Sequence, residues 1–195
     1  GVTGTLLSLD IILFYFFWEV MLLPVFLLIG LYGFGDKVFT TIKVTVYTMV
    51  GSLLMFIAIL YLGVAYHNEF GHWSFAYDKL MTITTIPYDI KVWLFLGFLA
   101  AFAIKIPIFP LHTWIMETYK DAPTGAVFLL SSIMAKLGVY AIVRFMIPIF
   151  PEIYVEFSIW FVSIGLFGLI YFGIAALMQD DIKRMFAYSS ASHLS

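Results

Sequence analysis

The sequence predicts an all-α fold, a polytopic bundle of transmembrane helices. The chain has 195 residues, of which 63% are hydrophobic and only 11% are charged. Its mean hydropathy is +1.04. This composition provides too little polar surface for a soluble domain. Several apolar runs also reach the roughly 20 residues that a helix needs to cross a bilayer. None shows the short alternating strands of a membrane barrel.

Five apolar runs follow one another along the chain, separated by polar residues or prolines. In order they are Asp10–Tyr32, Val44–Ala65, Ile90–Trp114, Ala122–Ile147 and Ile153–Met178. A sixth helix is expected to start near Ile182. The chain begins at Gly1 without a methionine and stops at Ser195 as this further segment starts. We therefore expect residues 1–195 to form a single transmembrane region, an internal fragment of a longer polytopic protein.

The third run, which contains FLGFLAAFAIKIPIFPLHTWI, should not be one continuous helix. Pro107 and Pro110 each lack a backbone N–H donor, and each disfavours the helical conformation of the preceding residue. Non-helical backbone at membrane depth persists only where it is buried in protein or lines a wet cavity. We predict a helix that is broken near Pro107 and Pro110, inside the bundle.

Charged side chains lie deep inside three of the runs, namely Glu19, Lys105 and Lys136. Each costs about 2.5–3.5 kcal/mol at a helix centre. Lys136 lies about 16 Å from the nearer end of its run by helical rise, too far to extend fully to the surface. The three charges favour a proton or ion relay, and the alternative is that they are snorkelling or structurally paired charges.

Lys105 precedes the predicted break, and burial deprives its ammonium of hydration. A carboxylate nearby would restore part of that stabilisation, so that opening and closing the pair would release and recapture a proton. Glu19 is the candidate partner, although the sequence leaves open whether the two touch. His112 lies seven residues further along and would share a face with Lys105 in a helix. Histidine is the residue type whose unperturbed side chain changes charge near neutral pH; the alternative is that His112 is simply a polar residue at a helix end.

The connections between the runs predict an orientation. GFGDKVFTTIK carries Lys37 and Lys43, and QDDIKR carries Lys183 and Arg184. Because successive helices alternate in direction, these two connections share a side of the membrane. The positive-inside rule assigns that side to the cytoplasm. The long HNEFGHW connection would then lie outside, although it is followed by Lys79.

Several kinds of chemistry are not supported by the sequence. The chain has no cysteine, which excludes disulfides and cysteine-ligated iron–sulfur clusters. No phosphate loop or nucleophile triad occurs. His67, Glu69 and His72 could suggest a metal site, but a solvated connection explains them more simply. We predict no metal, no bound cofactor, no redox catalytic residue and no nucleic-acid partner for this chain.

Four segments resemble the subunit M (chain 4) family of NADH–quinone oxidoreductase, respiratory complex I, whose membrane subunits are antiporter-like. They are FFWEVMLLPVFLLIGLYG, KIPIFPLHTW, DAPTGAVFLLSSIMAKLGVYAIVR and QDDIKRMFAYSSASHLS. The resemblance implies a proton-conducting domain built from inverted repeats. It further implies that Glu19 is the essential membrane glutamate, Lys105 the pumping lysine, Lys136 the linking lysine and His112 the motif histidine.

The resemblance also implies a setting. The chain would be a non-redox subunit of a translocase, with other membrane-arm subunits, lipid and protons as its partners. NADH or another donor, flavin, iron–sulfur clusters and quinone would belong to the parent complex. A bacterial inner membrane is expected, with the mitochondrial inner membrane as the alternative. Other functions left open are a subunit of a multi-subunit sodium/proton antiporter, a subunit of a membrane-bound hydrogenase, and a structural scaffold.

One part of the motif departs from the family pattern. The family usually continues its tryptophan with Leu-Pro-Asp-Ala-His, whereas Trp114 is followed here by IMETY. Glu117 keeps the acid, while Met116 replaces the proline and Tyr119 replaces the second histidine. A role for that second histidine therefore cannot be carried over to this chain.

Overall fold

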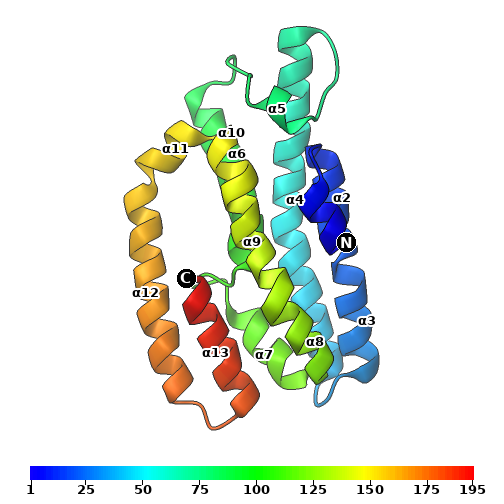
Figure 1. Ribbon diagram of the computed structural model, residues 1–195, viewed down its shortest axis with the longest axis vertical. Helices are drawn as coiled ribbons and strands as arrows, with labels where there is room; N and C mark the ends of the chain where they lie inside the picture. Colours follow the sequence, from blue (N-terminus) through cyan, green and yellow to red (C-terminus); the bar gives the residue numbers. More distant parts are fainter.

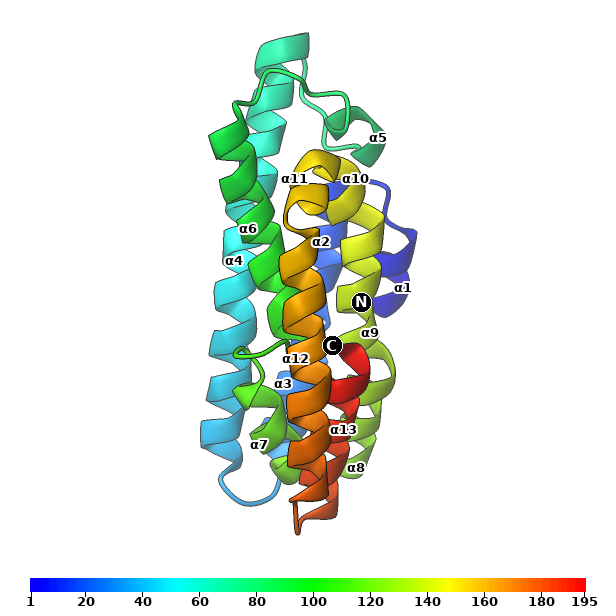
Figure 2. The same cartoon turned by 90° about the vertical axis from the view of Figure 1, so that its left-hand side faces the viewer.

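The computed structural model describes all 195 residues; its regular elements are all helices, and its one β-type pairing is an isolated bridge between Asp10 and Ala76. The segments are α1 (Val2–Leu7), α2 (Ile11–Val20), α3 (Leu22–Tyr32), α4 (Lys37–Phe70), α5 (Tyr77–Leu80), α6 (Tyr88–Lys105), α7 (Thr113–Asp121), α8 (Thr124–Leu129), η1 (Leu130–Met134), α9 (Ala135–Ala141), η2 (Ile142–Met146), α10 (Ile147–Ile149), α11 (Pro151–Glu156), α12 (Ser158–Leu177) and α13 (Ile182–Leu194). The long segments stand side by side in a bundle, with α4 against α6 and α12 against α13 (Figures 1 and 2).

Local chemistry sets several of the helix ends. Asp10, Asp36 and Asp181 each accept hydrogen bonds from backbone N–H groups in the first turn of α2, α4 and α13. These are the bonds expected of an N-cap carboxylate. Helix α4 ends at Gly71, whose φ of 78° lies in the left-handed region that favours glycine.

Four stretches are long and apolar enough to span a membrane, which confirms the predicted all-α membrane fold. They are Ile11–Tyr32, Lys37–Phe70, Thr124–Ile149 and Ser158–Leu177. The first is interrupted by a turn at Met21, and the third contains the two π-helical segments η1 and η2. Helix α4 is longer than its apolar run predicts, because it continues through polar residues at both ends and projects from one end of the bundle (Figure 1).

The remaining run is broken as predicted. Helix α6 ends at Lys105, and α7 begins only at Thr113. A hydrogen-bond substitution explains where the helix stops. Pro107 has no N–H to donate to the carbonyl of Ala103, and the N–H of Ile108 bonds to that carbonyl instead, at 3.0 Å. The carbonyl of Ile104 thereby loses its helical donor.

The side chain of Trp114 supplies the missing donor. Its indole Nε1–H bonds to the Ile104 carbonyl at 2.9 Å, in a fully buried position. The first turn of α7, which follows the break, is thus hydrogen-bonded to the end of α6. Such a bond matters at this depth because water cannot satisfy an exposed carbonyl inside a bilayer. This role of Trp114 is not apparent from the sequence alone.

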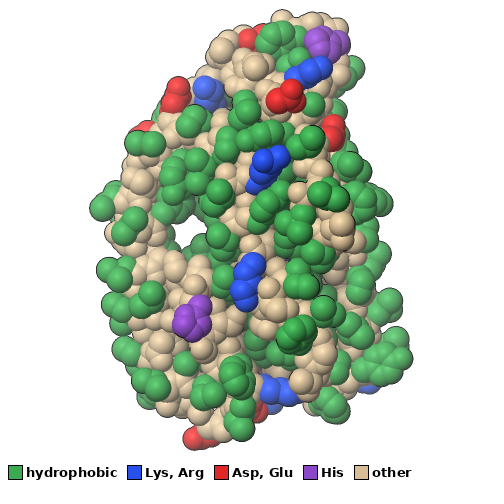
Figure 3. All heavy atoms as spheres, viewed as in Figure 1, with side chains coloured by type: hydrophobic (Ala, Val, Ile, Leu, Met, Phe, Trp, Pro, Cys, Tyr) green, Lys and Arg blue, Asp and Glu red, His purple; other side chains and the backbone are tan.

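The interior is built from aromatic rings and close helix contacts. Phe14 of α2 packs against Trp18, Phe102 and Phe145, with ring centroids 4.4 to 6.5 Å away. A Cβ at Gly51 of α4 would lie 2.8 Å from the Ile104 side chain and 3.1 Å from the Cα of Ala101, both in α6, so these two helices approach closely. Outward-facing apolar side chains cover much of the face shown in Figure 3, and most charged groups on it lie toward its two ends.

The capping bond generates a prediction. Replacing Trp114 by Phe keeps an aromatic ring but leaves the buried Ile104 carbonyl without its donor, which should cost about 1–3 kcal/mol. We expect the melting temperature of the purified full-length protein to fall. The matched control is Trp93→Phe, which makes the same substitution at a side chain that is 73% exposed. Equal melting temperatures for the two variants would show that the indole bond contributes nothing.

Candidate functional site

Lys105 is the buried cation at the centre of the site. It is the last residue of α6 and is 4% exposed. Its Nζ is buried and forms no hydrogen bond. The contact that it does make is with the indole ring of Trp18, whose centroid lies 5.4 Å from Nζ. A cation over a tryptophan face is attracted by the ring quadrupole, but that attraction is far weaker than full hydration.

Glu19 follows Trp18 on α2, so the predicted partner lies on the helix that packs against Lys105. The two side chains form no ion pair, since no carboxylate oxygen comes within 4.0 Å of Lys105 Nζ. Glu19 as a whole is only partly buried. Its Oε1 is buried and has no hydrogen-bond partner. The arrangement therefore places two unpaired charged groups on neighbouring helices, separated by more than a contact distance.

His112 lies at the far end of the irregular segment that separates α6 from α7. Because residues 106–112 are not helical, the seven-residue spacing does not place it on one helix face with Lys105. Its ring packs instead against Phe109, Tyr171 and Phe172. The imidazole is 7% exposed, and its Nδ1 has no hydrogen-bond partner. His112 thus faces α12 from within the break.

Lys136 differs from the sequence-based expectation of a deeply enclosed charge. It lies in the first turn of α9, directly after η1, and its side chain is exposed. The ammonium donates to the backbone carbonyl of Ser131 in η1. It lines a cavity of about 610 Å³ between η1–α9 and α13, together with Tyr119, Ser190 and His193. Hydroxyl and imidazole groups therefore surround Lys136, not apolar side chains alone.

Helix α7 is fixed to its neighbours at the end away from the break. The buried carboxylate of Asp121 accepts a bond of 2.6 Å from the hydroxyl of Thr40 in α4. Glu117 lies 3.5 Å from Arg184 of α13. Lys183 donates to the carbonyl of the residue after α7. Glu117, the acid retained from the family motif, thus contacts Arg184, and the sequence alone did not predict this contact.

The side chains considered for a metal in the HNEFGHW connection do not converge. The carboxylate of Glu69 accepts hydrogen bonds from two threonines of the following loop. The ring of His67 stacks on a tryptophan, and His72 contacts a tyrosine hydroxyl. No group of three or more potential metal ligands is assembled. The three side chains serve to organise the connection.

Comparison with known proteins identifies the family of this chain. The NADH:quinone oxidoreductase/Mrp antiporter transmembrane family matches residues 8–195. The chain is 38% identical to NADH-quinone oxidoreductase subunit M of Escherichia coli K12 and 36% identical to that of Pseudomonas aeruginosa. Each match covers 100% of this chain and 39% of the relative, so the chain spans about two fifths of their length.

Solved structures give the same result. A chain of respiratory complex I from Thermus thermophilus superposes with a TM-score of 0.86 at 32% identity, over 96% of this chain and 39% of that one. A chain of the Mrp complex from Dietzia is 21% identical with a TM-score of 0.79, over 98% of this chain and 20% of that one, and shows likeness of fold alone. The chain thus belongs to the NADH:quinone oxidoreductase/Mrp antiporter family of membrane proteins.

Proposed function

We propose that this chain forms part of a proton-translocating subunit in the membrane arm of an NADH:quinone oxidoreductase. The observation that carries the proposal is the buried, unpaired ammonium of Lys105 at the end of α6. A charge that is costly to bury and lacks a fixed partner is best explained by a function that changes its charge state. The 38% identity to a subunit M supports the same assignment.

In this proposal Lys105 carries the proton, and Glu19 modulates how tightly it is held. Because the two do not touch, a small movement suffices to bring the carboxylate closer or to withdraw it. The irregular segment 106–112 next to Lys105 supplies the freedom for that movement. Ile106 packs so closely on Gly138 that an added Cβ would lie 2.6 Å from its side chain. This contact joins the break to α9, the helix that carries Lys136.

Lys136 and His112 are proposed as further proton carriers. Lys136 faces a cavity lined by hydroxyl groups, which can order water and so pass protons. His112 is the titratable group of the break itself, and its buried Nδ1 has no hydrogen-bond partner within the chain. We assign no redox chemistry to this chain, which has no cysteine. NADH, flavin, iron–sulfur clusters and quinone would be bound by other subunits of the parent complex.

The proposed setting is a bacterial inner membrane, with other membrane-arm subunits as partners. The family description also names Mrp antiporters, so a sodium/proton antiporter subunit is the competing function. The solved Mrp relative supports the fold only, at 21% identity. The two functions differ in a measurable way: pumping by the first depends on electron transfer and should not require sodium.

The central prediction concerns Lys105 and Glu19. In the full-length subunit within its assembled complex, Lys105→Met should abolish proton pumping per electron transferred. Lys105→Arg should also fail, because arginine does not release its proton in a protein. Glu19→Gln should lower pumping at least about tenfold, which corresponds to about 1.4 kcal/mol, whereas Glu19→Asp should retain partial activity.

The measurement is acidification of reconstituted vesicles, with assembly checked by native gel. The matched control is Lys79→Met, which removes an exposed lysine outside the bundle. Full pumping by the assembled Lys105→Met complex would reduce the buried lysine to a structural role and refute the proposal.

A second prediction concerns orientation. The α3–α4 and α12–α13 connections lie at one end of the bundle, and the α4–α6 connection lies at the other (Figure 1). We expect the first two to be cytoplasmic. Single cysteines at Lys37, Asn68 and Asp180 can be labelled in intact cells with an impermeant maleimide, and residues 1–195 contain no other cysteine that would react. Only Asn68→Cys should react before permeabilisation. Labelling of Lys37→Cys or Asp180→Cys would reverse the orientation.

A further inference from the structure

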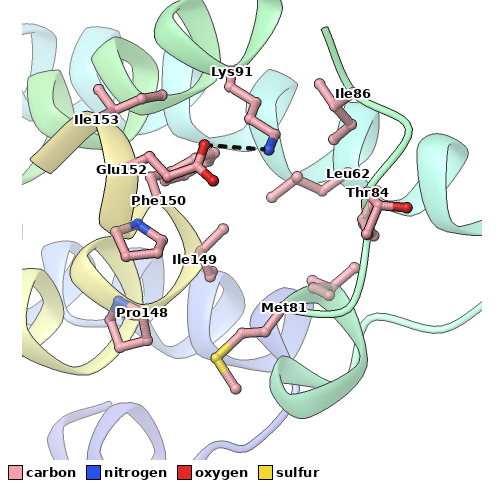
Figure 4. Close-up of a pocket in the computed structure, with 13 residues that line it drawn as sticks. Leu62, Met81, Thr84, Ile86, Lys91, Pro148, Ile149, Phe150, Glu152 and Ile153 are labelled. Carbon is pink, nitrogen blue, oxygen red and sulfur yellow. Dashed lines mark ion pairs between the residues drawn. The ribbon is translucent and has the colours of Figure 1, made fainter. Parts of the chain in front are cut away.

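A second cavity lies at the other end of the bundle, far from Lys105 and Lys136. It has a volume of about 360 Å³. Its walls come from α4, from the connection before α6, from the first turn of α6 and from α10–α11. Figure 4 shows these segments converging around an open space, with Lys91 and Glu152 facing each other at one side of it.

The floor of this cavity is apolar, and its edge carries one charge of each sign. Leu62, Leu80 and Ile153 are buried walls. Lys91 Nζ and Glu152 Oε2 are 3.8 Å apart, with side-chain exposures of 25% and 73%. That distance is longer than a hydrogen bond, so both groups retain bonding capacity for a third party. An apolar floor with one positive and one negative side chain at its edge is complementary to an amphiphilic molecule.

The depth of the cavity along the membrane normal can be judged from nearby tryptophans. Trp93 is 73% exposed and lies two residues beyond Lys91 on α6. Trp160 is 64% exposed and lies two turns beyond Glu152, near the start of α12. Exposed tryptophans on membrane helices gather at the level of the lipid headgroups. Lys91 and Glu152 therefore lie in the layer that headgroups occupy.

We propose that this cavity binds the headgroup of phosphatidylethanolamine. The phosphate would accept hydrogen bonds from Lys91, and the primary ammonium would donate to Glu152. The first methylene groups of the acyl chains would cover the apolar floor. The pair of charges selects among lipids: Glu152 repels a purely anionic headgroup, and the quaternary ammonium of phosphatidylcholine has no N–H to donate. The proposal concerns residues that take no part in proton transfer and is independent of the proposed function.

The test uses the full-length subunit in its complex, reconstituted in nanodiscs, with phosphatidylethanolamine that carries a diazirine near its glycerol. Photocrosslinks to the Pro148–Ile153 segment are quantified by peptide mass spectrometry. We expect unlabelled phosphatidylethanolamine to compete roughly tenfold better than phosphatidylcholine or phosphatidylglycerol, as expected from one charge-assisted hydrogen bond. Equal competition by all three lipids, or stronger competition by phosphatidylglycerol, would overturn the proposal.

Variants separate the two halves of the headgroup. Lys91→Gln should reduce crosslinking roughly tenfold, whereas Lys91→Arg should preserve it because the cation remains. Glu152→Ala removes the acceptor for the ammonium, so it should reduce crosslinking of phosphatidylethanolamine roughly tenfold and abolish its preference over phosphatidylcholine. Lys79→Gln, an exposed lysine in the neighbouring connection, is the matched control and should change nothing. Unchanged crosslinking in Lys91→Gln would refute the site, and pumping need not be measured for either result.

Discussion

Every backbone carbonyl inside a bilayer must find a donor within the protein, and Pro107 removes one at the end of α6. The consequences extend along the chain. The N–H of Ile108 replaces the lost donor, which frees the carbonyl of Ile104, and the indole of Trp114 then bonds to that carbonyl. The helix ends at Lys105 because of this exchange. The cation thus lies next to irregular backbone because the carbonyls at the end of α6 must take their donors from outside the helix.

The same low-polarity interior makes it costly to leave both Lys105 and Glu19 unpaired. Each has a buried polar atom without a hydrogen-bond partner, although pairing them would reduce the energetic cost of both. A purely structural pair would be expected to be closed. The aromatic face of Trp18 gives the ammonium a weak interaction that does not compete strongly with a carboxylate or with water. Such a setting suits a group that must exchange partners.

The sequence was most informative where one residue type has one physical consequence. Apolar length predicted the spanning helices, and Pro107 predicted the break. It was less informative where the outcome depends on packing between distant segments. The donor role of Trp114 depends on a carbonyl ten residues earlier, and the exposure of Lys136 depends on the cavity beside α13. The residue types alone do not predict the turn at Met21 or the π-helical segment before Lys136.

The broken helix formed by α6 and α7 is held by side-chain contacts at both ends and is irregular at its centre. At one end, Tyr88 at the start of α6 bonds to Glu156 of α11. At the other, Asp121 at the end of α7 bonds to Thr40 of α4. Any change in conformation that leaves these contacts intact must be taken up between them. The segment 106–112 is the one stretch there without a regular hydrogen-bond ladder, so it is the place where motion costs least. Because Lys105 borders this segment directly, a shift of the segment would change the surroundings of the cation.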